Sequence, residues 1–288
     1  MSDALVSTEW LAARLGAPDI RIADASFKMP GVKPSAREDY GLAHIPGAVF
    51  FDIDDIADSA SPLPHMLPSP EKFASRLRKL GLGDGNRIVF YDANGVAGAA
   101  RAWWMVRVFG HQDVSVLDGG LRKWQAAGRQ VDDLPPMPRE RHFTARLNSM
   151  LVRDKGQVLA NTATRREQLL DARAAGRFAG EAAEPWPGRR QGHIPGSLNL
   201  DHASLVDPTT GTMKPPEQLA ALFAAAGVDP KQPVVTSCGS GITACVLALG
   251  LHLAGRRDVA VYDGSWAEWG LPDGPPIETG SANSQTTL

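Results

Sequence analysis

Cysteine is scarce in this sequence: its 288 residues include only two, Cys238 and Cys245. Two thiols in one stretch supply neither a disulfide framework nor the four ligands of a structural zinc site. We therefore expect no bound metal, and we expect each cysteine to serve chemistry or packing by itself.

Long apolar runs and a strong charge of either sign are also missing. The most apolar stretch, 243–254, is shorter than the roughly 20 residues of a membrane span, and the N-terminus lacks the basic start and apolar run of a secretory signal. A net charge of −2 gives no electrostatic reason to expect nucleic acid or an anionic membrane as a partner. These absences predict a cytoplasmic protein with no nucleic-acid or membrane partner.

The sequence does contain an internal repeat. His-Ile-Pro-Gly stands at residues 44–47 and again at 193–196, and an Asp-Gly pair with a tryptophan six residues after the aspartate occurs at Asp118 and Asp263. The order is the same in both halves, with a period near 147 residues. Such a long period predicts a duplicated domain, and residues shared by both copies are expected to maintain the fold.

Each half alternates short β-branched runs with helical patterns, which is typical of βα units around a mostly parallel sheet. The expected strands are 20–23, 88–91, 114–117, 168–170, 234–237 and 259–262, and the expected helices are 71–80, 97–109, 217–226 and 243–254. Proline density at 132–138 marks the joint between the halves. The predicted domains are 1–131 and 158–278, joined by a linker at 132–157 and followed by a flexible tail at 279–288.

The two copies differ where ligands of open parallel sheets bind, at the carboxyl ends of the strands. Asp92 follows the strand at 88–91, whereas Cys238 follows the equivalent strand at 234–237. A carboxylate cannot act as a sulfur nucleophile. The first copy is therefore predicted to be catalytically silent, and the second to carry the chemistry.

The loop after Cys238 favours a reactive thiolate. It consists of Gly239, Ser240, Gly241, Ile242 and Thr243 and leads into a helix. Its glycines permit inward-pointing N–H groups, which together with the helix N-terminus form a nest for a thiolate or a persulfide.

Two further positions in this region narrow the interpretation. Cys245 falls inside an apolar helix, where packing is the better interpretation. A phosphatase-type loop needs an arginine to clamp the oxyanion, but Ala244 stands six residues after Cys238. The loop is therefore better suited to sulfur chemistry than to phosphate chemistry.

These motifs resemble the tandem-domain rhodanese family over nearly the whole chain. The matching stretches are 44–47, 61–68, 118–120, 171–173, 176–178, 192–196 and 238–244. The resemblance implies an α/β fold of two tandem rhodanese-like domains, each a mostly parallel sheet flanked by helices. It also implies that Cys238 takes sulfane sulfur from a small-molecule donor, 3-mercaptopyruvate, releases pyruvate, and passes the sulfur to cyanide, a small thiol or thioredoxin, without a cofactor.

The resemblance assigns proton transfer to Ser240 and His44. From the residues alone, the Ser240 hydroxyl is equally suited to capping the following helix. His44 has a counterpart in His193, which favours a turn-forming role for both. In the family an acidic residue precedes the histidine and completes a relay. Its usual position is not acidic here, which leaves two alternatives: Glu38 or Asp39 substitutes for it, or the relay does not operate.

Donor recognition is assigned to Arg177, whose guanidinium suits a carboxylate. The second arginine of the family falls at Trp186, so Arg189 or Arg190 is expected to supply that charge. Relatives that use thiosulfate tend to carry Arg and Lys directly after the cysteine, where this chain has two neutral residues. The alternatives left open are a thiosulfate enzyme and a persulfide carrier that turns over no small donor.

Overall fold

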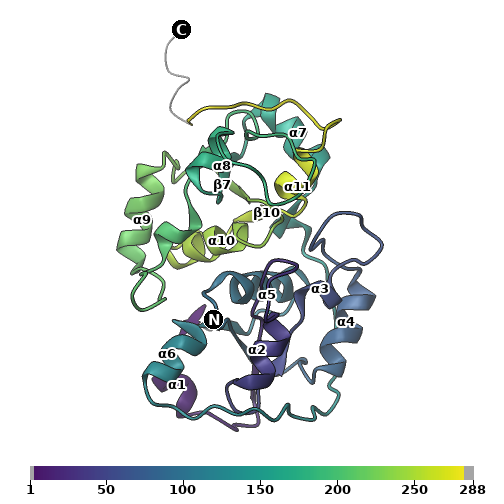
Figure 1. The fold of residues 1–288 in the computed structure, drawn as a ribbon, viewed down its shortest axis with the longest axis vertical. Coiled ribbons are helices and arrows are strands. Elements are labelled where there is room, and N and C mark those ends of the chain that lie inside the picture. Colours follow the sequence, from purple (N-terminus) through teal and green to yellow (C-terminus); the bar gives the residue numbers. More distant parts are fainter. Residues whose placement is uncertain (1–2, 282–288) are drawn as a thin grey trace. The chain divides into compact units, whose positions relative to one another are not determined.

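The computed structural model describes residues 3–281, which form two compact units (Figure 1). The first unit consists of residues 3–59, 67–148 and 207–213. The second consists of residues 60–66, 149–206 and 214–281. Both units therefore combine segments from both halves of the sequence.

The first unit is built on a parallel five-stranded sheet with the strand order β1-β5-β4-β2-β3. Its strands are β1 (Leu5–Val6), β2 (Ile20–Asp24), β3 (Val49–Phe50), β4 (Arg87–Tyr91) and β5 (Val114–Leu117). β4 is the central strand, and it pairs with β2 from Ile20↔Arg87 to Asp24↔Tyr91. The loop that follows β4 therefore emerges from the middle of the sheet.

Six helices complete this unit. They are α1 (Thr8–Ala12), α2 (Ala36–Leu42), α3 (Ile53–Ile56), α4 (Pro70–Lys79), α5 (Ala97–Val108) and α6 (Gly120–Ala126). Side-chain caps start four of them, because Ser7, Ser35, Asp52 and Ser69 each accept a hydrogen bond from a first-turn N–H group. These caps explain why short helices begin where they do.

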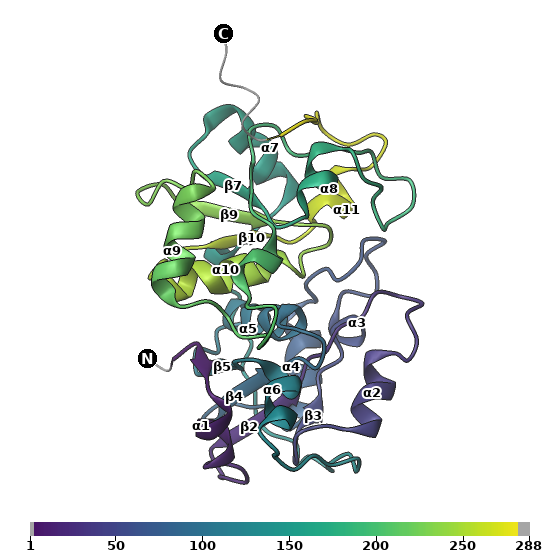
Figure 2. The same cartoon turned by 60° about the vertical axis from the view of Figure 1, so that its left-hand side comes forward.

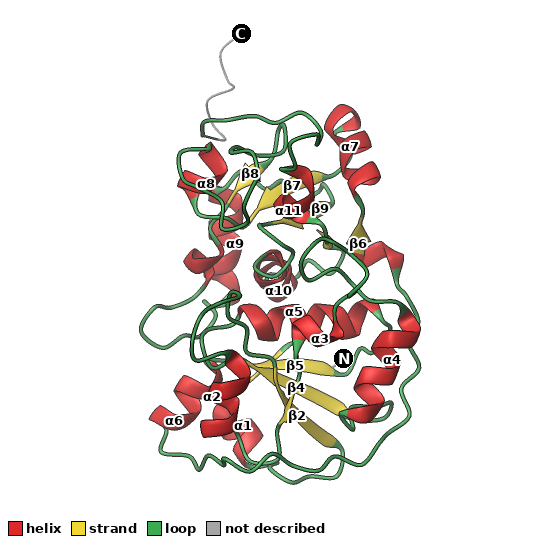
Figure 3. Ribbon diagram, turned by 45° about the vertical axis from the view of Figure 1, so that its right-hand side comes forward, coloured by secondary structure: helices red, strands yellow, loops and turns green. Residues whose placement is uncertain are grey.

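Helices lie on both sides of the first sheet (Figure 3). Leu11 of α1 and Trp124 of α6 join a core cluster with Ile22 and Val89 of the strands. Nearly all of α5 is buried, which fits its lack of a polar face. The sheet is thus covered on both faces, as a parallel sheet requires.

The second unit repeats this plan with the strand order β6-β10-β9-β7-β8, again all parallel (Figure 2). Its strands are β6 (Val152–Arg153), β7 (Gln168–Asp171), β8 (Leu198–Asn199), β9 (Val234–Ser237) and β10 (Ala260–Tyr262). Its helices are α7 (Lys155–Thr164), α8 (Ala175–Ala179), α9 (Pro216–Ala225), α10 (Ala244–Leu253) and α11 (Ser265–Trp269), with 3₁₀ turns at Ser149–Leu151 and His202–Leu205. β9 occupies the central place that β4 has in the first unit.

The predicted fold class is confirmed, and each predicted strand and helix is present within about two residues of its expected bounds. The two-residue edge strands and the shortest helices were not predicted, because so few residues show no periodicity. Regular structure resumes at Ser149, inside the stretch expected to be a linker. Of the expected tail, residues 282–288 lie outside the described residues.

Each unit contains one short segment from the other half of the sequence. Residues 60–66 pack in the second unit, and residues 207–213 pack in the first. Both segments lie at about the same place in the repeat. In the first unit the backbone N–H of Met213 donates to the Asp118 carboxylate (2.8 Å), which ties the second segment in place.

None of the helices in the described part of the chain is both long and apolar enough to cross a membrane.

Gly98 at the start of α5 tests the close packing of the first unit. A Cβ at Gly98 would lie 1.9 Å from the carbonyl oxygen of Ala25, so we expect Gly98→Ala to lower the free energy of unfolding by about 3 kcal/mol. Gly41 in α2 has open space around it, and Gly41→Ala is expected to raise stability by about 0.5 kcal/mol through helix propensity. Urea unfolding of both variants measures this, and equal effects would contradict the packing argument.

Candidate functional site

The cysteine loop lies at the carboxyl end of the central strand of the second unit. Cys238 directly follows β9, and the loop from Gly239 to Thr243 leads into α10. This is the position at which open α/β sheets bind their ligands. The fold thus places Cys238 where the sequence predicted it.

The loop directs a backbone donor at the sulfur. Cys238 is 1% exposed, and the N–H of Gly241 donates to its Sγ at 3.1 Å. Gly241 has a φ of +81°, a left-handed conformation that favours glycine. Ile242 is buried behind the loop, and Thr243 is the N-cap residue of α10. The N–H group and the start of α10 both stabilise negative charge on the sulfur.

The first unit shows what the same backbone arrangement binds. Asp92 follows β4, and its carboxylate accepts hydrogen bonds from the N–H groups of Asn94 (2.7 Å) and Gly98 (2.8 Å). The strand, loop and helix start of the first unit therefore bind the carboxyl group of the chain's own Asp92 through backbone N–H donors. By analogy, the corresponding loop in the second unit can offer N–H donors to the sulfur of a thiolate or a persulfide.

A histidine that the sequence analysis did not select lies beside this loop. A hydrogen bond of 2.9 Å joins Nδ1 of His65 to Oγ of Ser240, and the indole of Trp186 packs edge-on against the imidazole at 5.7 Å. His65 is 4% exposed and has a φ of +60°, a conformation that is uncommon outside glycine and frequent at functional sites. Ser240 therefore bonds to a histidine, and the N-cap position of α10 is occupied by Thr243, which makes no side-chain capping hydrogen bond.

His44 has a different environment from the one that the resemblance implied. Its Nδ1 bonds to the carbonyl of Tyr40 (2.8 Å) and its ring stacks on that of Tyr40, just as His193 bonds to and stacks on Phe178. Both histidines also form an isolated backbone bridge. His44 and His193 thus share the contacts expected of turn-forming residues, and the histidine that bonds to Ser240 is His65.

Arg177 lies against the cysteine loop. Its Nη2 lies 2.9 Å from the place where a Cβ on Gly239 would stand, so the guanidinium occupies the space left by the missing side chain. Glu184 holds it through Oε2 at 2.5 Å and also binds the buried Arg173. This network fixes one cation beside Cys238 and partly neutralises it.

The other two predicted arginines bind backbone carbonyls. Arg189 donates to Ala267 (2.9 Å), and Arg190 donates to Trp269 (3.0 Å) and Pro275 (2.7 Å). These bonds hold both guanidinium groups in the fold of the second unit. Of the three arginines predicted to bind the donor, Arg177 is the one that we place next to the Cys238 loop.

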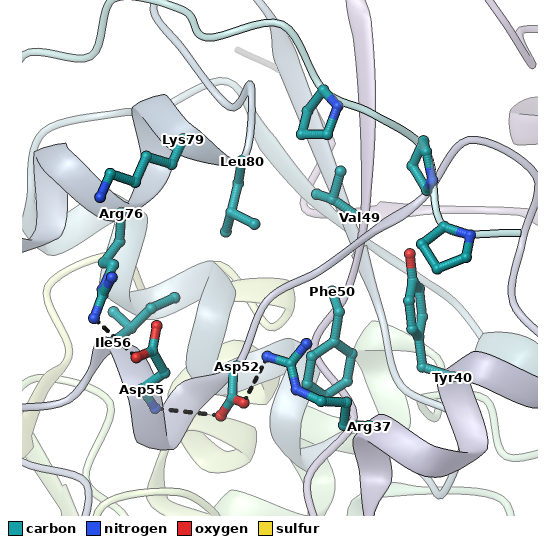
Figure 4. A pocket seen from close by; sticks show the side chains of 13 residues that line it. Arg37, Tyr40, Val49, Phe50, Asp52, Asp55, Ile56, Arg76, Lys79 and Leu80 are labelled. Carbon is teal, nitrogen blue, oxygen red and sulfur yellow. Dashed lines mark hydrogen bonds and ion pairs between the residues drawn. The ribbon is translucent and has the colours of Figure 1, made fainter.

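The pocket in Figure 4 lies in the first unit, between α2 and α4, and has a volume of about 300 Å³. Two ion pairs cross it, Arg37–Asp52 at 3.0 Å and Arg76–Asp55 at 2.9 Å. Among the described residues that line it, none is a predicted site residue. We therefore place the candidate site at the Cys238 loop.

Two parallel five-stranded sheets in tandem, one with a cysteine loop and one with a carboxylate in its place, define a tandem-domain rhodanese. The chain belongs to this family: the model of the rhodanese-like domain matches residues 7–127 and 154–271. The family assignment made from the sequence is thereby confirmed.

Individual relatives extend over most of the chain. Human 3-mercaptopyruvate sulfurtransferase is 43% identical over 272 residues, covering 92% of this chain and 91% of its own length. Bovine thiosulfate sulfurtransferase is 44% identical over 273 residues, with the same coverage. The crystal structure of SseA from Escherichia coli, a 3-mercaptopyruvate sulfurtransferase fold, matches with a TM-score of 0.84 at 40% identity, covering 92% of this chain and 99% of that one.

The two histidines provide a matched pair for mutagenesis. His65→Asn tolerates the left-handed backbone and keeps an amide beside Ser240, but it cannot exchange a proton, so we expect turnover to fall at least about tenfold with little change in melting temperature. His44→Asn is expected to lower the melting temperature while the folded fraction keeps its turnover. Steady-state kinetics measures the turnover, and calorimetry measures the melting temperature. Normal turnover in His65→Asn together with lost turnover in folded His44→Asn would contradict this assignment.

The buried carboxyl group of the silent copy predicts a pH dependence of stability. Burial raises the pKa of Asp92 from 3.8 to about 7, against the opposing effect of its two N–H donors. The folded state thus keeps a proton that the unfolded state releases, so stability falls as pH rises from about 4 to 7 and is level above that range.

Asp92→Asn is expected to remove this contribution, which is on the order of 3 kcal/mol. The difference in unfolding free energy between wild type and variant, measured by urea titration at pH 4.5 and 7.5, gives the contribution directly. The exposed control Asp133→Asn should show the wild-type change in unfolding free energy between the two pH values. The same change in Asp92→Asn would refute the assignment.

Proposed function

We propose that this chain is a sulfurtransferase that moves sulfane sulfur from 3-mercaptopyruvate through a Cys238 persulfide to a thiol acceptor and releases pyruvate. The observation that carries the proposal is the Cys238 sulfur beneath the Gly241 N–H, with the Ser240–His65 pair two residues further along the loop. The names of the relatives, which include enzymes for both 3-mercaptopyruvate and thiosulfate, support sulfur transfer as the reaction class.

In the first step the Cys238 thiolate attacks the sulfur of the donor. A sulfur–sulfur bond forms, the carbon–sulfur bond breaks, and its electron pair passes to carbon, giving the enolate of pyruvate. The carbon takes up the proton that the donor thiol loses, which yields pyruvate. Ser240, joined to His65 at 2.9 Å, is the group that moves this proton, because an imidazole can both accept and donate a proton.

In the second step the acceptor attacks the outer sulfur of the persulfide. The sulfur–sulfur bond breaks and the Cys238 thiolate returns, stabilised by the Gly241 N–H at 3.1 Å. A small thiol, thioredoxin or cyanide has the nucleophile that this step needs. We place the reaction in the cytoplasm, and no step calls for a metal or an organic cofactor.

The charge around the loop favours a donor with one carboxylate. Arg177 stands beside Gly239 and is half neutralised by Glu184, while Gly239 and Ser240 add no charge. A single guanidinium matches the monoanion 3-mercaptopyruvate better than the dianion thiosulfate. The thiosulfate alternative rests on the relatives of that name, and the carrier alternative on the carbonyl bonds that occupy Arg189 and Arg190.

The deciding experiment compares pyruvate release from 3-mercaptopyruvate with thiocyanate formation from thiosulfate and cyanide. We expect the first to be strongly preferred, and Cys238→Ser to lower it at least about a thousandfold because the hydroxyl is a far weaker nucleophile. Cys245→Ala is the matched loss of a thiol and is expected to stay within about threefold of wild type, since Cys245 is buried in α10 and its thiol gives the loop only a weak hydrogen bond, to the Gly241 carbonyl (3.2 Å).

Other results of this comparison have distinct meanings. A preference for thiosulfate would assign the donor to the second candidate. Sulfur uptake by Cys238 without turnover of either donor would identify a carrier. Full activity of Cys238→Ser would overturn all three interpretations.

A further inference from the structure

The first turn of α11 holds the backbone of the nucleophile. The N–H of Cys238 donates to Oγ of Ser265 (3.1 Å), and the N–H of Trp266 donates to the carbonyl of Cys238 (2.9 Å). The N–H of Ala267 donates to the carbonyl of Gly239 (2.7 Å). Both backbone polar groups of Cys238 are thus bound by consecutive residues of one turn.

Ser265 has a strained backbone in this turn. Its φ is +48°, a left-handed conformation that is costly for a residue with a side chain, and it is 0% exposed. Its hydroxyl donates its one proton to the carbonyl of Tyr262 (2.8 Å). Toward Cys238 the same oxygen therefore acts only as an acceptor, which fixes the direction of that hydrogen bond.

The silent copy has the same turn without the hydroxyl. Gly120 stands at the place of Ser265 with a φ of +55°, and a Cβ on it would lie 2.1 Å from the carbonyl oxygen of Asp92. The N–H of Leu121 still donates to that carbonyl (3.2 Å), as Trp266 does to Cys238. The turn itself is therefore common to both copies, whereas the hydroxyl belongs to the copy with the cysteine.

We propose that Ser265 is a positioning residue of the sulfur-transfer reaction: its hydroxyl fixes the backbone of Cys238 so that Sγ stays aligned with the Gly241 N–H. The position of Sγ follows the backbone of Cys238, because only one carbon separates the sulfur from Cα. Without the hydroxyl, the buried Cys238 N–H is an unsatisfied donor, and the loop shifts to satisfy it. The role in turnover rests on the proposed function, but the state of the thiol can be measured without any donor.

Two variants separate the hydroxyl from the backbone strain. Ser265→Ala removes the hydroxyl and keeps the strain, whereas Ser265→Gly removes both and copies the silent unit. We expect both to slow alkylation of Cys238 by iodoacetamide about three- to tenfold at pH 7, and to move its pH profile to higher pH, because less thiolate is held at the nest. Ser265→Gly is expected to melt at a higher temperature than Ser265→Ala.

Peptide mass spectrometry assigns the alkylation to Cys238 rather than Cys245. Ser197→Ala is the control, since its buried hydroxyl also donates to a carbonyl, that of Ile194 (2.7 Å), and its alkylation profile should equal that of wild type. The proposal would be overturned if Cys238 in both Ser265 variants were alkylated as in wild type. It would also be overturned if only Ser265→Ala slowed alkylation, because backbone strain and not the missing hydroxyl would then be the cause. If alkylation slows as expected but wild type releases no pyruvate, the positioning of the thiol stands and the proposed donor fails.

Discussion

Hydrogen bonds from backbone N–H groups to the side chain at the end of the central strand are the constraint on which both units depend. In the first unit the acceptor is the carboxyl group of Asp92, and in the second it is the sulfur of Cys238. The same strand–loop–helix geometry therefore serves structure in one copy and chemistry in the other. A single residue, placed where the N–H groups converge, decides which of the two it is.

The sequence allowed most of the fold to be predicted. The strands at 88–91 and 234–237 are apolar, and the helices that follow them are long and apolar. Both recur in each half, so periodicity and duplication identify them together. Short elements such as β3 and β8 have two residues each, and only pairing with a neighbouring strand defines them. The segments 60–66 and 207–213 were assigned to the wrong unit by sequence order, because contiguity in the chain does not reveal packing across halves.

The site residues that lie in one loop could be predicted from the sequence. A residue that reaches the site from a distant segment could not. Cys238 and Ser240 lie two residues apart, but His65 lies 175 positions from Ser240 in the sequence. A signal for His65 was available in the duplication itself. His44 has a histidine counterpart in His193, which marks a shared structural role, whereas Thr212 stands at the corresponding place for His65. Absence from the second copy is what a residue specific to the chemistry should show.

The exchange of segments between the two halves bears on how the duplicated gene can change. Because His65 of the first half bonds to Ser240 in the second unit, deletion of the first half would also remove a residue from the candidate site. The first unit likewise depends on the second half of the sequence, because the N–H of Met213 donates to the carboxylate of Asp118. Neither half of the sequence contains all the residues of its own unit, so a cut at the proline-rich joint would leave both units incomplete.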